Sequence, residues 1–106
     1  MGLREQLMDD LKQAMRERDE RRKMVIRSIL AALQHAETEL DPDGQRVRLK
    51  DDDILALIAR QALQREESIV EFRKVRREDL VAAEEAELVI LRAYLPQQMG
   101  RELLAG

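Results

Sequence analysis

Apolar residues near the start of the chain recur at intervals of three and four positions, which places them on one side of a helix. The apolar positions of this first series are Leu3, Leu7, Leu11, Ala14 and Met15. A charged run, RERDERRK, interrupts the series at residues 16–23. Within that run Asp19 can cap the next helix, because its carboxylate can accept a hydrogen bond from a free backbone N–H of the first turn. The pattern therefore predicts two consecutive helices separated near Asp19.

A second apolar series predicts a long helix over about residues 20–40. Its apolar positions are Ile26, Ile29, Leu30, Leu33, Ala36 and Leu40. The series ends at residues 41–44, Asp-Pro-Asp-Gly, in which Asp, Pro and Gly occupy the places that they favour in a β-turn. We therefore expect the helix to end at this turn, with a short irregular connection over residues 45–50.

A third series predicts another long helix, over about residues 52–74. Its apolar positions are Leu55, Ile58, Ala62, Ile69 and Phe72. The three aspartates of residues 51–53 supply a cap and a negatively charged first turn, which the positive end of the helix dipole favours. A helix of this length extends for roughly 36 Å, more than a compact domain of this size requires. We therefore expect an elongated molecule.

The fourth helix is expected to begin at Glu78 and Asp79 and to end before Pro96, because proline excludes its preceding residue from the helical region. Its apolar positions are Leu80, Ala83, Leu88, Leu91, Tyr94 and Leu95. No segment alternates between apolar and polar residues as a half-buried strand does. The predicted fold is all-α, an elongated four-helix domain over residues 1–95. Residues 96–106 are interpreted as a linker and the start of a further subdomain.

Composition excludes several classes of protein. The chain has 106 residues, of which 44% are hydrophobic, with four Gly and no Cys. Disulfide scaffolds and zinc ribbons need cysteine, collagen needs regular glycine, and disordered chains are less apolar. No apolar run approaches the roughly 18 residues of a membrane span, and the N-terminal sequence lacks the apolar stretch of a signal peptide. We therefore expect a cytoplasmic protein without a membrane partner.

Residue types that carry out catalysis are few and scattered. His35 is the only histidine, and Ser28 lies too far before it on the same helix to contact it, so a catalytic triad is not expected. A di-iron site needs glutamate three residues before each of two histidines, whereas residue 32 is alanine.

His35 and Glu39 have the spacing of a simple helical pair, and the glutamates of residues 84–87 favour a solvated acidic face. The glycines are too dispersed for a phosphate-binding loop. We expect no catalytic residue, no metal and no cofactor, which makes an enzyme the weakest functional hypothesis.

The net charge of −3 conceals two basic segments. Residues 12–27 contain seven basic and three acidic side chains, a net +4, and residues 60–77 contain six and three, a net +3. A basic helix face binds phosphates through the release of counterions. The candidate residues for binding a nucleic acid or a partner are Arg16, Arg22, Lys23, Arg27, Arg65, Arg73 and Arg77. Aromatic side chains are not interleaved with these cations, which disfavours sequence-specific recognition of single strands. A solvated surface crossed by ion pairs is the alternative.

Several segments of the chain resemble the YqeY-like family. The segments are LxxDLKxAM (7–15), QREESIVEFRK (64–74), REDLV (77–81), EEAEL (84–88) and YLPQQM (94–99), of which the last is the most specific. Together they extend the resemblance over nearly all of residues 3–99.

The resemblance implies an all-helical N-terminal subdomain and a link to tRNA-dependent amidation. The family shares its domain with the tail of the B subunit of the glutamine-dependent aspartyl/glutamyl-tRNA amidotransferase. In that enzyme the tail helps to hold tRNA, while other domains carry out phosphorylation and amide transfer. The implied activity of such a complex is that of a carbon–nitrogen ligase with glutamine as the amido donor, and no catalytic residue is carried over to this chain.

This sequence departs from the family pattern at two places. Arg76 stands where the family usually has glycine, and a residue with a Cβ resists positive φ, so we expect the turn to be rebuilt or to be a distorted continuation of the helix. Family members also continue into a small three-helix C-terminal subdomain, of which residues 100–106 hold at most the first turn.

Two functional hypotheses follow from these patterns. In the first, which we favour, the chain is a non-catalytic accessory that binds tRNA or an amidotransferase-like complex through its basic helix faces. In the second, the chain is a helical protein–protein interaction or self-association module whose charges serve solubility.

Overall fold

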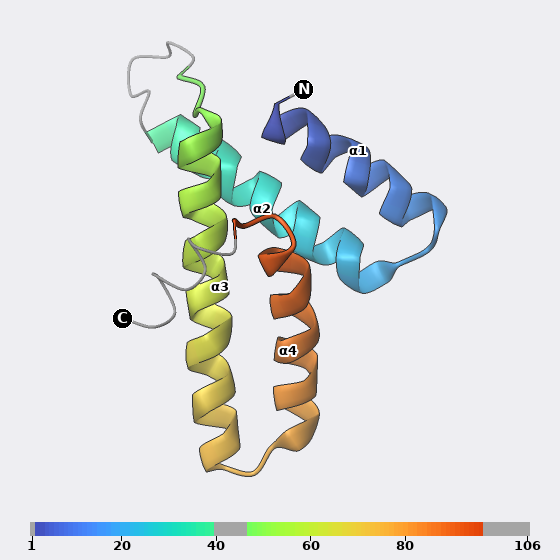
Figure 1. The fold of residues 1–106 in the computed structure, drawn as a ribbon, viewed down its shortest axis with the longest axis vertical. Coiled ribbons are helices and arrows are strands. Elements are labelled where there is room, and N and C mark those ends of the chain that lie inside the picture. Colours follow the sequence, from blue (N-terminus) through green and yellow to red (C-terminus); the bar gives the residue numbers. More distant parts are fainter. Residues whose placement is uncertain (1, 40–46, 97–106) are drawn as a thin grey trace. The chain divides into compact units, whose positions relative to one another are not determined.

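The computed structural model describes residues 2–39 and 47–96, which form the helices drawn in Figure 1. The helices are α1 (Leu3–Arg16), α2 (Glu20–Glu39), α3 (Asp51–Lys74) and α4 (Glu78–Arg92). Every regular element within these two ranges is a helix, which confirms the all-α prediction. Both long helices begin and end within one residue of the bounds expected for them. The turn expected at residues 41–44 and the tail at 97–106 lie outside the described residues.

The chain divides into two compact units, Met1–Leu57 and Ile58–Gly106, and α3 passes from the first into the second. Each unit is therefore described by itself. In the described part of the chain, none of the helices combines the length and the apolar character needed to cross a bilayer.

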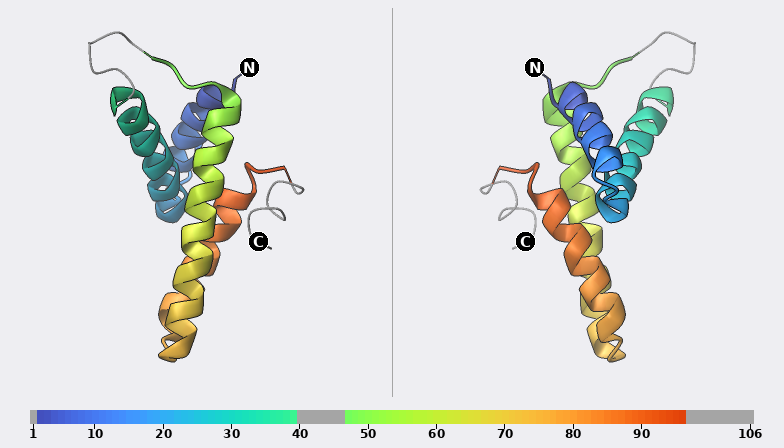
Figure 2. Two further views of the ribbon diagram at one scale, coloured as in Figure 1. Left: turned by 90° about the vertical axis from the view of Figure 1, so that its left-hand side faces the viewer. Right: turned by 90° about the vertical axis from the view of Figure 1, so that its right-hand side faces the viewer.

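In the first unit, α1 and α2 run antiparallel and lie side by side, as Figure 1 and the two views of Figure 2 show. Only residues 17–19 connect the two helices, and a connection this short makes consecutive helices antiparallel neighbours. The buried apolar residues of this unit are Leu7, Ala14, Val25, Ile26, Ile29, Leu33 and Ile54. They come from all three helices of the unit, so the core of the unit requires the first turns of α3 as well as the helical hairpin.

In the second unit, residues 58–74 of α3 run antiparallel to α4 (Figure 1). The buried apolar residues of this unit are Ile58, Ala59, Ala62, Ile69, Val81, Leu88 and Leu91. Aliphatic side chains therefore make up this core, while Phe72 and Tyr94 are only half-buried.

Some predicted core positions differ from those observed by one residue. Ala14 is buried, whereas its neighbour Met15 is 50% exposed, and Ile54 is buried, whereas Leu55 is half-buried. Neighbouring residues on a helix point about 100° apart, so periodicity alone does not decide which of two adjacent apolar residues contacts the core. Tyr94 also lies beyond the end of α4, in a tightened turn that its N–H closes by donating to the Leu91 carbonyl.

The turn between α1 and α2 has the hydrogen bonds of a Schellman motif, a common helix ending with one residue in the left-handed conformation. Arg18 occupies the left-handed position with φ = 56°. Its N–H donates to the Met15 carbonyl at 3.3 Å, and the Asp19 N–H donates to the Ala14 carbonyl at 2.9 Å. The Arg22 N–H donates to Asp19 Oδ1 at 3.1 Å, which confirms Asp19 as the cap of α2.

The turn between α3 and α4 repeats this arrangement. Arg76 has φ = 56°, its N–H donates to the Arg73 carbonyl at 3.1 Å, and the Arg77 N–H donates to the Phe72 carbonyl at 3.0 Å. The expectation that arginine would force the turn to be rebuilt or distorted is therefore wrong. The two backbone hydrogen bonds close the turn and hold Arg76 in the conformation that glycine adopts most easily.

Candidate nucleic-acid interface

The seven basic residues proposed from the sequence fall into both units. Arg16, Arg22, Lys23 and Arg27 belong to the first unit, and Arg65, Arg73 and Arg77 belong to the second. Within each unit they lie at or near an interhelical turn, except for Arg65, which lies in the middle of α3.

In the first unit, two of the four candidates are held by carboxylates. Arg22 lies 3.7 Å from Asp10 and 3.9 Å from Glu17, and Lys23 lies 3.0 Å from Glu20. The side chains of Arg22 and Lys23 are only 27% and 23% exposed. Their charges are therefore largely engaged within the unit.

All three candidates of the second unit are paired with α4 or its first turn. Arg65 Nη1 lies between two glutamates one turn apart, 3.1 Å from Glu84 Oε2 and 3.2 Å from Glu87 Oε2. The Glu84 oxygen is buried and faces Arg65 without the alignment of a hydrogen bond. Arg73 pairs with Glu85 at 2.7 Å. These contacts join α3 to α4, so both arginines have a structural role that needs no ligand.

Arg77 forms a local pair with Asp79 through two hydrogen bonds, at 3.2 and 3.1 Å. The hydrogen bond from the guanidinium holds the pKa of Asp79 below its ordinary value, and the same bond raises the pKa of Arg77. Both side chains are exposed, so solvent screens the pair and a competing anion can reach Arg77.

The remaining two candidates, Arg16 and Arg27, are exposed and have no ion pair with the residues that the structure describes. In the same basic segment, sequence reasoning left out two further exposed arginines without an ion pair, Arg18 in the turn and Arg21 in the first turn of α2. The alternation of charge along the chain included these residues in the basic segment. The charge pattern did not show which of these cations form ion pairs with carboxylates.

The acidic residues of the turn are engaged by other groups. Glu17 accepts a hydrogen bond from Gln13 Nε2 at 3.0 Å and faces Arg22. Asp19 caps α2 through the Arg22 N–H, and Glu20 pairs with Lys23. Among residues 2–39 and 47–96, these pairings leave Arg16, Arg18 and Arg21 without a carboxylate partner. We call these three arginines the basic turn.

The three arginines of the basic turn differ in their effect on the stability of the two helices. Arg16 lies in the last turn of α1, where the negative end of the helix dipole favours a cation. Arg21 lies in the first turn of α2, where the positive end disfavours one. Arg18 occupies a backbone conformation that costs roughly 1–2 kcal/mol for residues other than glycine. Arg18 and Arg21 thus lie at positions where other residues would make the helices more stable. A guanidinium group can bind phosphate through two parallel hydrogen bonds.

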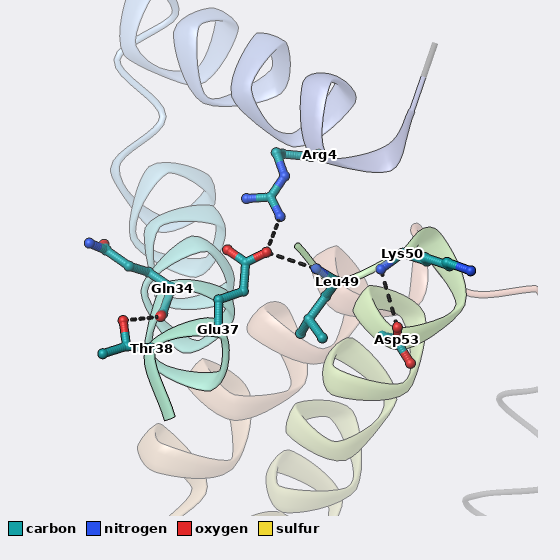
Figure 3. Close-up of polar contacts among 7 residues, drawn as sticks. All are labelled: Arg4, Gln34, Glu37, Thr38, Leu49, Lys50 and Asp53. Atoms are coloured by element: carbon teal, nitrogen blue, oxygen red, sulfur yellow. Dashed lines mark hydrogen bonds and ion pairs between the residues drawn. The ribbon is translucent and has the colours of Figure 1, made fainter. Parts of the chain in front are cut away.

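A second polar cluster lies at the other end of the hairpin, around Glu37 of α2 (Figure 3). Glu37 Oε2 accepts a hydrogen bond from Arg4 Nη2 of α1 and another from the Leu49 N–H at 2.8 Å. Burial by itself raises the pKa of Glu37, but the hydrogen bonds from Leu49 and Arg4 outweigh it and hold the pKa below its ordinary value. A single carboxylate therefore connects α1, α2 and the segment that leads into α3.

The start of α3 is fixed in a similar way. The Lys50 N–H donates to Asp53 Oδ2 at 3.1 Å (Figure 3), and the Leu3 N–H donates to Asp51 Oδ1 at 3.2 Å. Asp53 thus confirms the predicted cap of α3, and Asp51 accepts from the first N–H of α1. This end of the unit is a structural network in which Glu37, Asp51 and Asp53 each have a partner.

Groups suited to metal or acid–base chemistry do not converge in the described part of the chain. No three of its His, Cys, Asp and Glu residues could hold a metal ion together. His35 Nε2 lies 3.3 Å from Glu39 Oε1, which confirms the predicted helical pair, and both side chains are at least 70% exposed.

Comparison with known proteins identifies a family. The family model described as Yqey-like protein matches residues 4–106. Among curated proteins, the chain is 38% identical to "Altered inheritance of mitochondria protein 41, mitochondrial" from Lachancea thermotolerans, over 86% of this chain and 46% of that protein. A protein of the same name from Saccharomyces cerevisiae strain YJM789 is 38% identical, over 86% of this chain and 47% of that protein. Another, from Vanderwaltozyma polyspora, is 33% identical, over 84% of this chain and 46% of that protein. The chain thus spans about half the length of the curated relatives that it matches.

The names of these relatives contradict the expectation of a cytoplasmic protein, because each is named a mitochondrial protein. The expectation was based on the absence of an apolar leader and of a membrane span. Those features describe how a chain interacts with a bilayer and do not identify the compartment in which it works.

Proposed function

Because the chain belongs to the YqeY-like protein family, we propose that it is a non-catalytic accessory domain that binds tRNA in the setting of amidotransferase-type chemistry. Reactions of that type join carbon to nitrogen with glutamine as the amido donor, and other domains carry them out. The part of this chain is to hold the RNA through basic side chains. The resemblance of its sequence to the amidotransferase tail supports this setting.

The observation that carries the proposal is the basic turn. Three arginines lie within six residues of one another, and the three carboxylates of the same turn are engaged by other groups. Cations that are not neutralised within the protein attract polyphosphates most strongly, because each one releases a condensed counterion when it contacts a phosphate. The contact surface that we propose is therefore narrower than the seven candidates. It keeps Arg16 and adds Arg18 and Arg21. It leaves out Arg27, which lies about two turns into α2, and it leaves the ion-paired residues a structural role.

A non-catalytic role fits the distribution of reactive groups. His35 is exposed beside Glu39, and the Thr38 hydroxyl donates to the Gln34 carbonyl one turn earlier at 2.9 Å (Figure 3). A nucleophile needs a neighbouring base to activate it, and these two side chains are occupied by partners on their own helix.

The test is a titration of the purified chain with bulk tRNA at low and at near-physiological salt. The first variant combines Arg16→Ala, Arg18→Gly and Arg21→Ala, with glycine at residue 18 because it adopts φ = 56° without strain. A matched variant with Arg73, Lys74 and Arg77 changed to Ala also removes three positive charges, so both variants have a net charge of −3 − 3 = −6. Circular dichroism checks that both remain helical.

We expect the chain to bind tRNA with an affinity that falls as salt rises, and the basic-turn variant to lose this binding while the matched variant keeps most of it. Equal losses in both variants would show that only net charge matters. The absence of binding at low salt would overturn the proposal.

A second candidate function has one observation in its favour. Met8 and Met15 of α1 are 48% and 50% exposed, and Met24 of α2 is 64% exposed. Exposed methionines adapt to many shapes and are common on surfaces that bind other helices. The second candidate is therefore a helical interaction or self-association module, and the mass of the chain in solution over a range of concentrations tests self-association directly.

A further inference from the structure

We propose that the basic turn binds the phosphate backbone of double-helical RNA and does not bind the bases of a single strand. This inference rests on the proposed function and specifies the class of RNA structure that the same surface recognises. It follows from the side chains that surround the turn and from the conformation that holds it.

Phe, Tyr and Trp, the side chains that stack most strongly on bases, are missing from the first unit. Phe72 and Tyr94 are the only aromatic residues of the chain, and both belong to the second unit. Proteins that bind single strands depend on aromatic side chains, each of which contributes roughly 1–3 kcal/mol per stacked base. The first unit therefore has no aromatic means of ordering an unpaired strand.

Apart from the arginines themselves, side chains that could read base edges are also scarce near the turn. Gln13 is the only amide among residues 12–27, and its Nε2 donates to Glu17 at 3.0 Å. The carboxylates of Asp19 and Glu20 are engaged by the Arg22 N–H and by Lys23. The groups left to an RNA ligand are guanidinium groups, which bind phosphates most readily.

Backbone hydrogen bonds close the turn that carries these guanidinium groups. Two backbone hydrogen bonds hold Arg18 in the left-handed conformation, and Arg16 and Arg21 lie in the adjoining helical turns. The connection closes one end of the α1–α2 hairpin (Figure 2). The short closed end of a helical hairpin cannot wrap around a flexible strand, and ordering such a strand costs conformational entropy. A double helix instead presents phosphates that are already ordered and at higher density.

The expected magnitude follows from three contacts. Each phosphate neutralised contributes a slope of about −0.9 to the dependence of log affinity on log salt for a double helix and about −0.7 for a single strand. Three contacts give about −2.7 and −2.1, so a fourfold rise in salt should lower duplex affinity about 40-fold. Removal of the three arginines should bring the slope close to zero.

The experiment compares three labelled RNAs by fluorescence anisotropy over a salt series. They are bulk tRNA, a hairpin with a stem of about 16 base pairs, and an unstructured strand with the same number of nucleotides. The protein is the full chain, beside the Arg16→Ala, Arg18→Gly, Arg21→Ala variant and a variant with lysine at the same three positions, which keeps the charge.

We expect the hairpin to bind about as tightly as tRNA and at least tenfold more tightly than the single strand. The alanine–glycine variant should lose this preference, and the lysine variant should keep the salt slope with weaker binding. Single-strand binding equal to or tighter than hairpin binding would overturn this inference and leave the proposed function standing. If none of the three RNAs binds at low salt, both fail.

Discussion

Replacement of Glu37 by glutamine tests whether one carboxylate holds the first unit together. Glu37 Oε2 accepts hydrogen bonds from Arg4 and from the Leu49 N–H, and its side chain is only 16% exposed. Glutamine has nearly the same shape, so Glu37→Gln leaves no cavity and removes only the negative charge.

The magnitude follows from the two hydrogen bonds. A bond to a charged acceptor is about twice as strong as one between neutral groups, and contributes roughly 1.5–3 kcal/mol against about 1 kcal/mol. In Glu37→Gln the Leu49 bond becomes one between neutral groups, and the Arg4 bond keeps its charged donor but loses the ion-pair attraction. Together these changes give a loss of about 1.5 kcal/mol in the free energy of unfolding. For a domain of this size that corresponds to a fall of roughly 6–12 °C in Tm.

The same argument predicts how the loss depends on pH. Burial raises the pKa of Glu37, but the bonds from Leu49 and Arg4 lower it further, so the folded-state pKa lies below the unfolded value. The folded state therefore holds its proton less tightly, and the stabilisation is present above the unfolded pKa and disappears as pH falls through the folded pKa. Near neutral pH Glu37→Gln should be less stable than the parent chain, and in acid the two stabilities should converge.

Urea denaturation followed by circular dichroism at several pH values between neutral and acid measures both effects. Glu39→Gln is the matched control, because it removes the same charge from the same helix at a side chain that is 70% exposed and pairs with His35. Its effect should stay within about 0.5 kcal/mol. A loss for Glu37→Gln no larger than that of the control, or one that is unchanged in acid, would refute the reasoning.

Substitutions at three further positions test the helix ends and the core, each measured as the change in the free energy of unfolding. Arg76→Gly should stabilise the chain by about 0.5 kcal/mol, because relief of the left-handed strain exceeds the added entropy of the unfolded chain. Arg76→Val should destabilise the chain, and equal stabilities of the glycine and valine variants would contradict the left-handed conformation of residue 76. Asp19→Ala should cost about 1 kcal/mol through loss of the cap on α2, while Asp19→Asn should retain most of it. Leu7→Ala should cost about 2–5 kcal/mol, since Leu7 is fully buried in the first unit; a cost below about 1 kcal/mol would place Leu7 outside the core.

The candidate site shows which ion pairs can be predicted from the sequence and which cannot. The spacing of charges along the chain located the basic segment and the helical pair of His35 with Glu39, because both depend on residues a few positions apart. Spacing did not reveal that Arg65 faces Glu84 and Glu87. Those contacts join residues about twenty positions apart, and only the antiparallel packing of α3 on α4 brings them together.

The sequence by itself determined the helices and most of their ends. Apolar periodicity, the aspartate caps and the proline after α4 act over a few residues, so α2 and α3 could be predicted to within one residue at each end. These local interactions are the same whatever the rest of the chain does.

Only the tertiary structure decided which residues of those helices are buried and which cations are left unpaired. Ala14 contacts the core and Met15 does not, because the packing of α2 against α1 selects between two neighbours on the helix surface. Arg18 and Arg21 remain unpaired because Gln13, Arg22 and Lys23 engage the carboxylates of the turn. Burial and pairing depend on distances between segments, which the order of residues along a single helix does not contain.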